Sequence, residues 1–215
     1  MARKNKALFL GSVILVFLSL FSSSCSSSSY NSSQNPPGSF DKILLNKSCL
    51  MVIAPENFRD EELFLTKETL ESAGINVTVT SVTTGNIKGM LGANVLVNKS
   101  ISEFNTEDFD CVIIVGGSGA PELLNHQEVL NFVKYSYDSG KLVGAICLGP
   151  MILAEAGILT GKEATVFKAS QAIKLFEEKN VVFVDEPVVK SGGIITANGP
   201  KAAEDFAKAI IEELK

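Results

Sequence analysis

The sequence contains no tryptophan and a single histidine, and only 7% of its 215 residues are aromatic. Together with 17 glycines, this composition favours an α/β domain with many tight strand-to-helix turns over an all-β sandwich. Basic residues do not cluster beyond the first six positions, and the formal net charge is −5, so no nucleic-acid partner is expected. The length suits one sizeable domain.

The four cysteines lack the paired spacing of a metal site. Cys25, Cys49, Cys111 and Cys147 form neither a CxxC pair nor a Cys/His ligand pattern, so we expect no metal and no other cofactor. Cys49 and Cys111 fall within predicted strands, and we interpret them as buried, inert thiols. Cys25 and Cys147 stand in patterns that point to chemistry.

The first forty residues follow the pattern of an export signal. Three basic residues precede the apolar run 7–21, which is short for a transmembrane helix, and a serine-rich stretch follows. Ser22–Ser24 before Cys25 resemble the lipobox of prokaryotic lipoproteins, although Ser22 stands where leucine is expected. We therefore predict a signal peptide at 1–24 and an exported lipoprotein, anchored through a lipid on Cys25 to the extracytoplasmic face of the membrane. Simple secretion and an uncleaved anchor are the alternatives.

Residues 25–41 are rich in serine, asparagine and proline, which is typical of a flexible tether. A coil of this length spans roughly 20–24 Å. The folded domain, predicted at 42–215, would then stay close to a membrane surface without entering it.

Predicted strands and helices alternate through this domain. Alternation of this kind predicts a doubly wound, mostly parallel sheet with helices on both faces. Residues 82–104 fit it loosely, as a hairpin or an extended excursion. The predicted strands are 49–54, 76–81, 111–115, 142–146, 164–167 and 181–184, with a hairpin over 188–190 and 194–197, and the predicted helices lie within 56–74, 127–137, 150–159, 170–178 and 200–214.

Cys147 lies at the junction between an apolar strand, 142–146, and a helix-competent segment that starts at Pro150. A nucleophile elbow has this layout, in which small flanking residues such as Gly144 and Gly149 permit a tight turn. Backbone N–H groups at the start of the next helix can then stabilise negative charge on the side chain. The alternative interpretation is that Cys147 is one more small buried apolar residue.

A second turn, GGSGA at 116–120, follows the predicted strand 111–115. A glycine-rich turn at the carboxyl end of a parallel strand can present backbone N–H groups to a ligand. It matches neither GxGxxG nor GxxxxGK[ST], so it is not a dinucleotide-binding or phosphate-binding loop of those kinds.

Three segments, in this order and spacing, resemble the ThiJ/PfpI family: NFRDEEL at 57–63, VIIVGGSGA at 112–120 and GAICLGPMILAEAGILTGKEAT at 144–165. The resemblance covers about 42–214 and implies a flavodoxin-like, class I glutamine amidotransferase-like fold. Members commonly dimerise, so the resemblance also implies a homodimer.

The resemblance further implies the roles of four residues. Cys147 matches the reactive cysteine, Glu62 matches the acidic residue that contacts it, and the backbone N–H groups of Gly117 and Leu148 match the oxyanion hole. For Glu62 to donate a hydrogen bond to a thiolate, or to share a proton with it, this carboxyl must be at least partly protonated.

The chain departs from the family's pattern in its histidines. Leu148 stands where protease-like members carry histidine, and Val166 and Phe167 are nearest to the position where glyoxalase- or deglycase-like members often have one. Pro150 replaces the histidine that follows CLG in class I glutamine amidotransferases, so amidotransferase activity is not expected. His126 is interpreted as a surface or capping residue.

Three hypotheses about function follow. In the first, the protein is a cysteine-dependent hydrolase or lyase of small reactive carbonyls or their protein adducts, in which Cys147 attacks and Glu62 moves the proton. In the second, it is a non-enzymatic redox or stress module whose Cys147 is oxidised to a sulfinic acid. In the third, it is a tethered chaperone or scaffold that does not use this cysteine.

Overall fold

A computed structural model describes residues 44–215 of the chain. The predicted signal peptide, the predicted tether and Cys25 lie outside these residues. Across the part of the chain that is described, no helix combines the length and the apolar character needed to cross a membrane.

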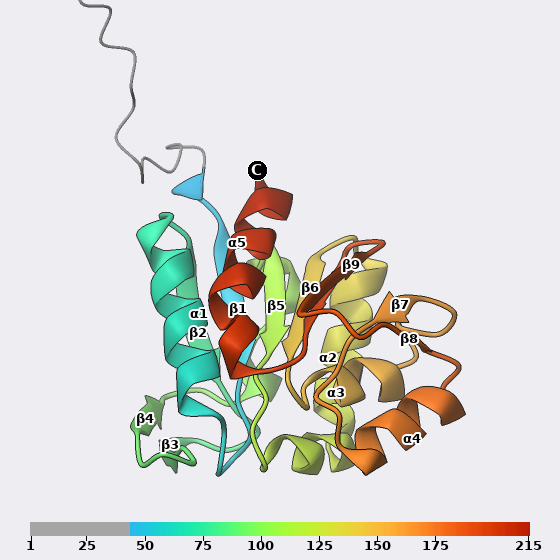
Figure 1. Cartoon of the computed structure of the whole chain (residues 1–215). Coiled ribbons are helices and arrows are strands. Elements are labelled where there is room, and N and C mark those ends of the chain that lie inside the picture. The colour runs from blue at the N-terminus through green and yellow to red at the C-terminus, as the bar shows by residue number, and fades with distance from the viewer. Residues whose placement is uncertain (1–43) are drawn as a thin grey trace, which may run out of the picture. The chain divides into compact units, whose positions relative to one another are not determined.

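The centre of the fold is a six-stranded sheet with the strand order β2-β1-β5-β6-β10-β9 (Figure 1). Neighbouring strands are parallel except for β9, which pairs antiparallel with β10 as the predicted hairpin. The doubly wound, mostly parallel sheet expected from the alternation of elements is confirmed. Its strands are β1 (Ser48–Val52), β2 (Asn76–Thr80), β5 (Cys111–Ile114), β6 (Leu142–Ile146), β9 (Val188–Ser191) and β10 (Ile194–Ala197).

Helices cover both faces of this sheet (Figure 1). On one face, α1 (Asp60–Ser72) packs beside α5 (Ala203–Leu214). On the other lie α2 (Gln127–Asp138), α3 (Pro150–Glu155) and α4 (Ser170–Glu178). Because both faces are covered, the central strands are apolar at nearly every position, which explains the continuous apolar runs in the sequence.

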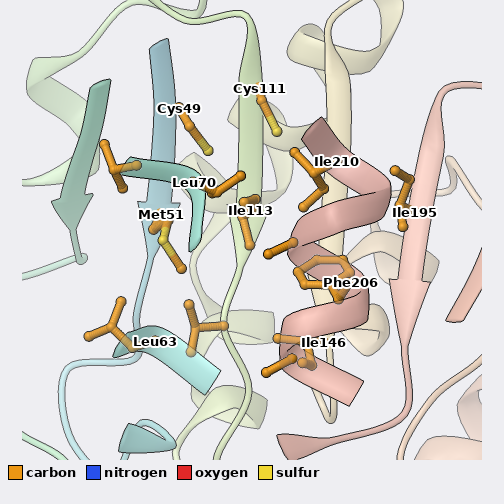
Figure 2. Close-up of a cluster of buried hydrophobic side chains, with 14 of the residues drawn as sticks. Cys49, Met51, Leu63, Leu70, Cys111, Ile113, Ile146, Ile195, Phe206 and Ile210 are labelled. Atoms are coloured by element: carbon orange, nitrogen blue, oxygen red, sulfur yellow. The ribbon is translucent and has the colours of Figure 1, made fainter. Parts of the chain in front are cut away.

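The core between the sheet and the α1/α5 pair is made of side chains that alternate along the strands. Cys49 and Met51 of β1 point into it, whereas Leu50 and Val52 point to the opposite core. Figure 2 shows Cys49, Met51 and Phe206 within this core. Cys49 and Cys111 are fully buried and carry free thiols, in agreement with their interpretation as core residues.

Two small sheets lie outside the main one. Residues 82–104 contain an antiparallel hairpin of β3 (Gly85–Lys88) and β4 (Asn94–Val97). The predicted strands 164–167 and 181–184 are reduced to β7 (Glu163–Ala164) and β8 (Val182–Phe183), which pair only with each other. They cannot join the main sheet beside β6, because β6 already pairs with β5 and β10.

The remaining elements are short 3-10 helices, and two helices differ from expectation at their ends. α3 stops at Glu155 instead of continuing towards 159, and a 3-10 turn precedes α5. The 3-10 helices are η2 (Ile101–Glu103), η3 (Thr106–Asp108), η4 (Ala120–Asn125) and η5 (Pro200–Ala202).

The strand order places a topological switch point between β1 and β5. From β1 the chain moves outward to β2, and it later returns to β5 on the other side of β1. Loops at the carboxyl ends of strands diverge at such a point, and ligands of open α/β sheets bind there. The segments that follow β1, β5 and β6 meet at this edge of the sheet.

Candidate active site

Cys147 occupies a sharp turn directly after β6. Its φ of 61° lies in the left-handed region, which is strained for a residue with a side chain. Its N–H donates to the carbonyl of Ala197 at 2.8 Å, and its own carbonyl accepts from the N–H of Phe167 at 2.8 Å. The neighbouring segments therefore hold this strained backbone on both sides, which is the geometry of a nucleophile elbow.

Two glycines permit the close approach of β5 and β6 at the elbow. A Cβ atom on Gly149 would lie 2.5 Å from the carbonyl oxygen of Ile114. A Cβ atom on Gly116 would lie 2.5 Å from both the Cβ of Cys147 and the Oε2 of Glu62. Because contacts this short do not occur between real atoms, only glycine fits at either position.

Two backbone N–H groups lie close to the sulfur of Cys147. Those of Gly117 and Leu148 favour negative charge on it and lower the pKa of the thiol. Gly117 has a φ of 110°, and a Cβ atom there would lie 2.4 Å from the carbonyl oxygen of Asn57. The structure thus brings together at one sulfur the two donors expected from sequence.

Glu62 lies in the first turn of α1 and is fully buried. Its Oε2 accepts a hydrogen bond from the N–H of Gly116 at 3.1 Å, whereas its Oε1 has no hydrogen-bond partner among the described residues. Burial raises the pKa of Glu62 to about 7, against the lowering effects of the Cys147 thiol and the Gly116 N–H. At neutral pH this carboxyl is therefore protonated in a large fraction of molecules.

Burial also raises the pKa of the Cys147 thiol, to about 12, and the negative charge of Glu62 adds to the rise. The two N–H donors lower this pKa but do not outweigh burial and charge. The thiol and the Glu62 carboxyl affect each other's pKa, although Oε1 of Glu62 has no hydrogen-bond partner among the described residues. The pair consequently keeps at least one proton at neutral pH, and a thiolate is favoured only when that proton resides on Glu62.

A cavity of about 290 Å³ opens onto the sulfur. Glu62, Gly117, Cys147 and Leu148 all line it, so the four site residues predicted within the folded domain converge on one space. Within this lining, which belongs to the described chain, Glu62 supplies the only carboxyl group. Its other lining residues are Arg59, Met90, Ser118, Phe167 and Pro200.

The cavity wall next to Cys147 is apolar, and the single histidine of the chain lies elsewhere. Leu148 and Phe167 both line the cavity. His126 occupies the N-cap position of α2, makes no capping hydrogen bond with its side chain, and contacts Glu128 at 3.1 Å. It does not line the cavity.

Two further residues shape the cavity and were missed from sequence. The buried carboxylate of Asp60 accepts hydrogen bonds from the N–H groups of Leu91 at 2.8 Å and Ala93 at 2.9 Å, which ties the β3–β4 turn to α1. Met90 extends from that turn into the cavity lining, and its Sδ accepts from the N–H of Ser118 at 3.2 Å. The acidic run 60–62 was the available signal, but the contacts of Asp60 depend on a turn thirty residues away.

The fold and this site define a doubly wound α/β protein with a cysteine on a strained elbow and a buried glutamate beside it. Residues 47–213 match the model of the DJ-1/PfpI family, and the chain belongs to that family.

Several relatives support the assignment. A Methanocaldococcus jannaschii protein, MJ0967, is 41% identical over 204 residues, which cover 94% of this chain and 96% of the relative. The glutathione-independent glyoxalase DJR-1.2 of Caenorhabditis elegans is 30% identical over 169 residues, which cover 79% of this chain and 89% of that enzyme. Two Pyrococcus proteins named deglycases also match, at 27% and 26% identity.

The crystal structure of a ThiJ/PfpI domain protein from Brachyspira murdochii superposes with a TM-score of 0.74 at 35% identity, covering 78% of this chain and 95% of that one. The family therefore includes proteins named for glyoxalase and deglycase activity, and the flavodoxin-like fold is shared with a solved member.

Proposed function

We propose that this protein is a cysteine-dependent hydrolase or lyase, glyoxalase- or deglycase-like, that acts on small reactive carbonyls or on their protein adducts. One observation carries the proposal: Cys147 and the buried Glu62 line one cavity, and the N–H groups of Gly117 and Leu148 point at the sulfur. A nucleophile, a single acid/base group and a pair of oxyanion donors suffice for addition to an aldehyde.

In the proposed reaction of an α-oxoaldehyde, the Cys147 thiolate attacks the aldehyde carbon and the carbonyl electron pair moves to oxygen. The N–H groups of Gly117 and Leu148 stabilise the oxyanion, and protonated Glu62 gives its proton to it. The Glu62 carboxylate then removes the hydrogen from the former aldehyde carbon as a proton and returns it to the neighbouring carbon. Transfer of the hydroxyl proton between the two adjacent oxygens yields a 2-hydroxy thioester.

Water hydrolyses this thioester to a 2-hydroxy acid and releases the Cys147 thiol. The sum is one oxoaldehyde and one water converted to one 2-hydroxy acid. The aldehyde carbon is oxidised while the neighbouring carbon is reduced, so no external oxidant is needed. A pKa of about 7 suits Glu62 to act first as acid and then as base at neutral pH. Because one carboxyl serves every proton transfer, we expect slow turnover.

The test is turnover of methylglyoxal to lactate by the wild-type protein and by Cys147→Ala. We expect activity in the wild type and none in the variant, with the fold retained by circular dichroism. Cys111→Ala is the matched control, because Cys111 is also a buried thiol but lies in the core and not in the cavity. Equal activity of wild type and Cys147→Ala would reject the enzymatic proposal.

The same donors favour a second function, as a redox module. Two peroxide molecules would oxidise the Cys147 thiol to a sulfinate and be reduced to water, and the Gly117 and Leu148 N–H groups would hold the sulfinate oxygens. The raised pKa of the thiol makes this reaction slow at neutral pH. If mild peroxide leaves Cys147 unmodified while alkylating agents reach it, the redox proposal fails.

We further propose that the protein is exported and anchored to the membrane through a lipid on Cys25. The support is the order of basic, apolar and serine-rich segments before Cys25. The alignment with the M. jannaschii relative covers 94% of the chain and therefore extends into this segment. A mass spectrum of the native protein should show an acylated Cys25 as its first residue; an unmodified Cys25 or an intact Met1 start would refute the proposal.

A homodimer is also proposed, on the resemblance to the family alone. Light scattering of the purified protein should give twice the monomer mass, and a monomer at micromolar concentration would contradict it.

A further inference from the structure

A second cavity, of about 420 Å³, adjoins the one that contains Cys147. Phe167 and Pro200 line both cavities, so the two spaces are neighbours and share part of their walls. Phe167 is 49% exposed and lies at the surface between the two cavities. A ligand whose reactive carbon reaches Cys147 can therefore extend past Phe167 into the second cavity.

The second cavity carries a local positive charge, although the whole chain is acidic with a net charge of −5. Its lining holds two lysines, Lys168 and Lys201, against one carboxylate, Asp185. Lys168 is neutralised by an ion pair with Asp185 at 2.5 Å. Lys201 makes no ion pair with any residue in the described range 44–215, so its ammonium group is available to a ligand.

The remaining lining is suited to a short carbon chain with a polar end. Phe167, Pro200 and Val166 provide apolar surface, and the half-buried Asn198 adds an amide beside Lys201. Small-molecule sites commonly have volumes of about 300–1,000 Å³, and the Cys147 cavity alone falls just short of that range. A three-carbon aldehyde would leave the second cavity empty.

We infer that the preferred substrates are anionic carbonyl compounds with a short aliphatic chain. The aldehyde at one end lies at Cys147, the chain passes Phe167, and the carboxylate at the other end is bound by Lys201 in the second cavity. The inference rests on the proposed function for the identity of the reactive group. It assigns the second cavity as a specificity subsite and Lys201 as the residue that selects the charge.

The kinetic test uses two α-oxoaldehydes with chains of equal length. In 4,5-dioxopentanoate a carboxylate stands where 2-oxopentanal has a methyl group, and the products are 2-hydroxyglutarate and 2-hydroxypentanoate. We expect kcat/KM to be about fivefold higher for the anionic substrate, as for a partly exposed ion pair. Lys201→Met should abolish this preference through KM and leave 2-oxopentanal unaffected, and high salt should weaken it.

Lys174→Met is the matched control, because Lys174 lies on α4 with its side chain 76% exposed and does not line either cavity. It should retain the wild-type preference. An equal preference in wild type and Lys201→Met, or a preference for the neutral substrate in the wild type, would overturn the inference.

A binding experiment separates failure of the subsite from failure of the proposed function. Levulinate and 2-pentanone share one carbon chain, lack an aldehyde, and can be titrated into Cys147→Ser by ligand-observed NMR. Tighter binding of levulinate that is lost in Cys147→Ser/Lys201→Met supports the subsite even if no aldehyde is turned over. Equal binding of both ketones contradicts the subsite even if methylglyoxal is converted.

Discussion

Replacing Glu62 by glutamine should make Cys147 easier to alkylate while it abolishes turnover. The thiol's pKa of about 12 arises first from burial and second from the negative charge of Glu62. Glutamine keeps the size of the side chain and its acceptor oxygen for the Gly116 N–H but carries no charge. The contribution of Glu62 to the thiol pKa is therefore removed, and the contribution of burial stays.

The expected magnitude follows from the thiolate fraction. With a pKa of about 12, the thiolate fraction at pH 8 is on the order of 10⁻⁴, whereas a free thiol with a pKa near 8.5 is about one quarter ionised. Because burial is the larger cause, we assign roughly one pKa unit to the charge, or about 1.4 kcal/mol and a tenfold change in rate.

The assay is iodoacetamide labelling against pH, quantified for each cysteine-containing peptide. Cys49 and Cys111 are internal controls, because both are fully buried in the core beneath α1 and α5. We expect faster labelling of Cys147 in Glu62→Gln and no change at the two controls. Labelling of Cys147 that is unchanged or slower, with constant controls, would show that Glu62 does not oppose the thiolate and would refute the reasoning.

Three further predictions follow from the same residues. The pKa of Glu62 is raised from 4.5 to about 7, so its stabilising contribution is complete below pH 4.5 and is lost as the pH rises through 7. Urea unfolding should show a loss of about 3 kcal/mol in the free energy of unfolding over this window, and the loss should be missing in Glu62→Gln. The same pH dependence of this free energy in both proteins would contradict the prediction. Gly117→Ala should lower the free energy of unfolding by about 1–3 kcal/mol more than Gly85→Ala. Both glycines have φ near 110°, but only at Gly117 would the added Cβ lie 2.4 Å from a carbonyl oxygen. Equal melting temperatures of the two variants would rule out the steric argument. Asp60→Ala should lower the free energy of unfolding by about 1–3 kcal/mol and raise KM, because the N–H groups of Leu91 and Ala93 lose their acceptor and Met90 loses its position. Asp60→Asn should restore part of the stability and part of the KM. An unchanged KM in Asp60→Ala would show that the turn does not shape the cavity.

The arrangement of the sheet could be predicted from the sequence because it depends on local patterns. Apolar runs such as 111–115 and 142–146 predict buried parallel strands, and the structure pairs them in parallel. The glycines before Ile194 predict a hairpin, which places an antiparallel strand at the edge of the sheet. β7 and β8 were predicted too long, because whether a short apolar run joins a sheet depends on which neighbours already occupy its edges.

The sequence by itself determined the family, the elbow around Cys147 and the small residues around it, because the spacing of glycine, cysteine and proline constrains the local backbone directly. Only the tertiary structure decided that the thiol's pKa is raised and not lowered, since this depends first on how deeply the Cys147 thiol is buried and second on the charge of Glu62 beside it. It also decided that Asp60 holds the turn bearing Met90, and that Lys201 lies in a cavity next to that of Cys147. These features join residues far apart in the chain, and their free energies depend on burial and distance, which no local pattern encodes.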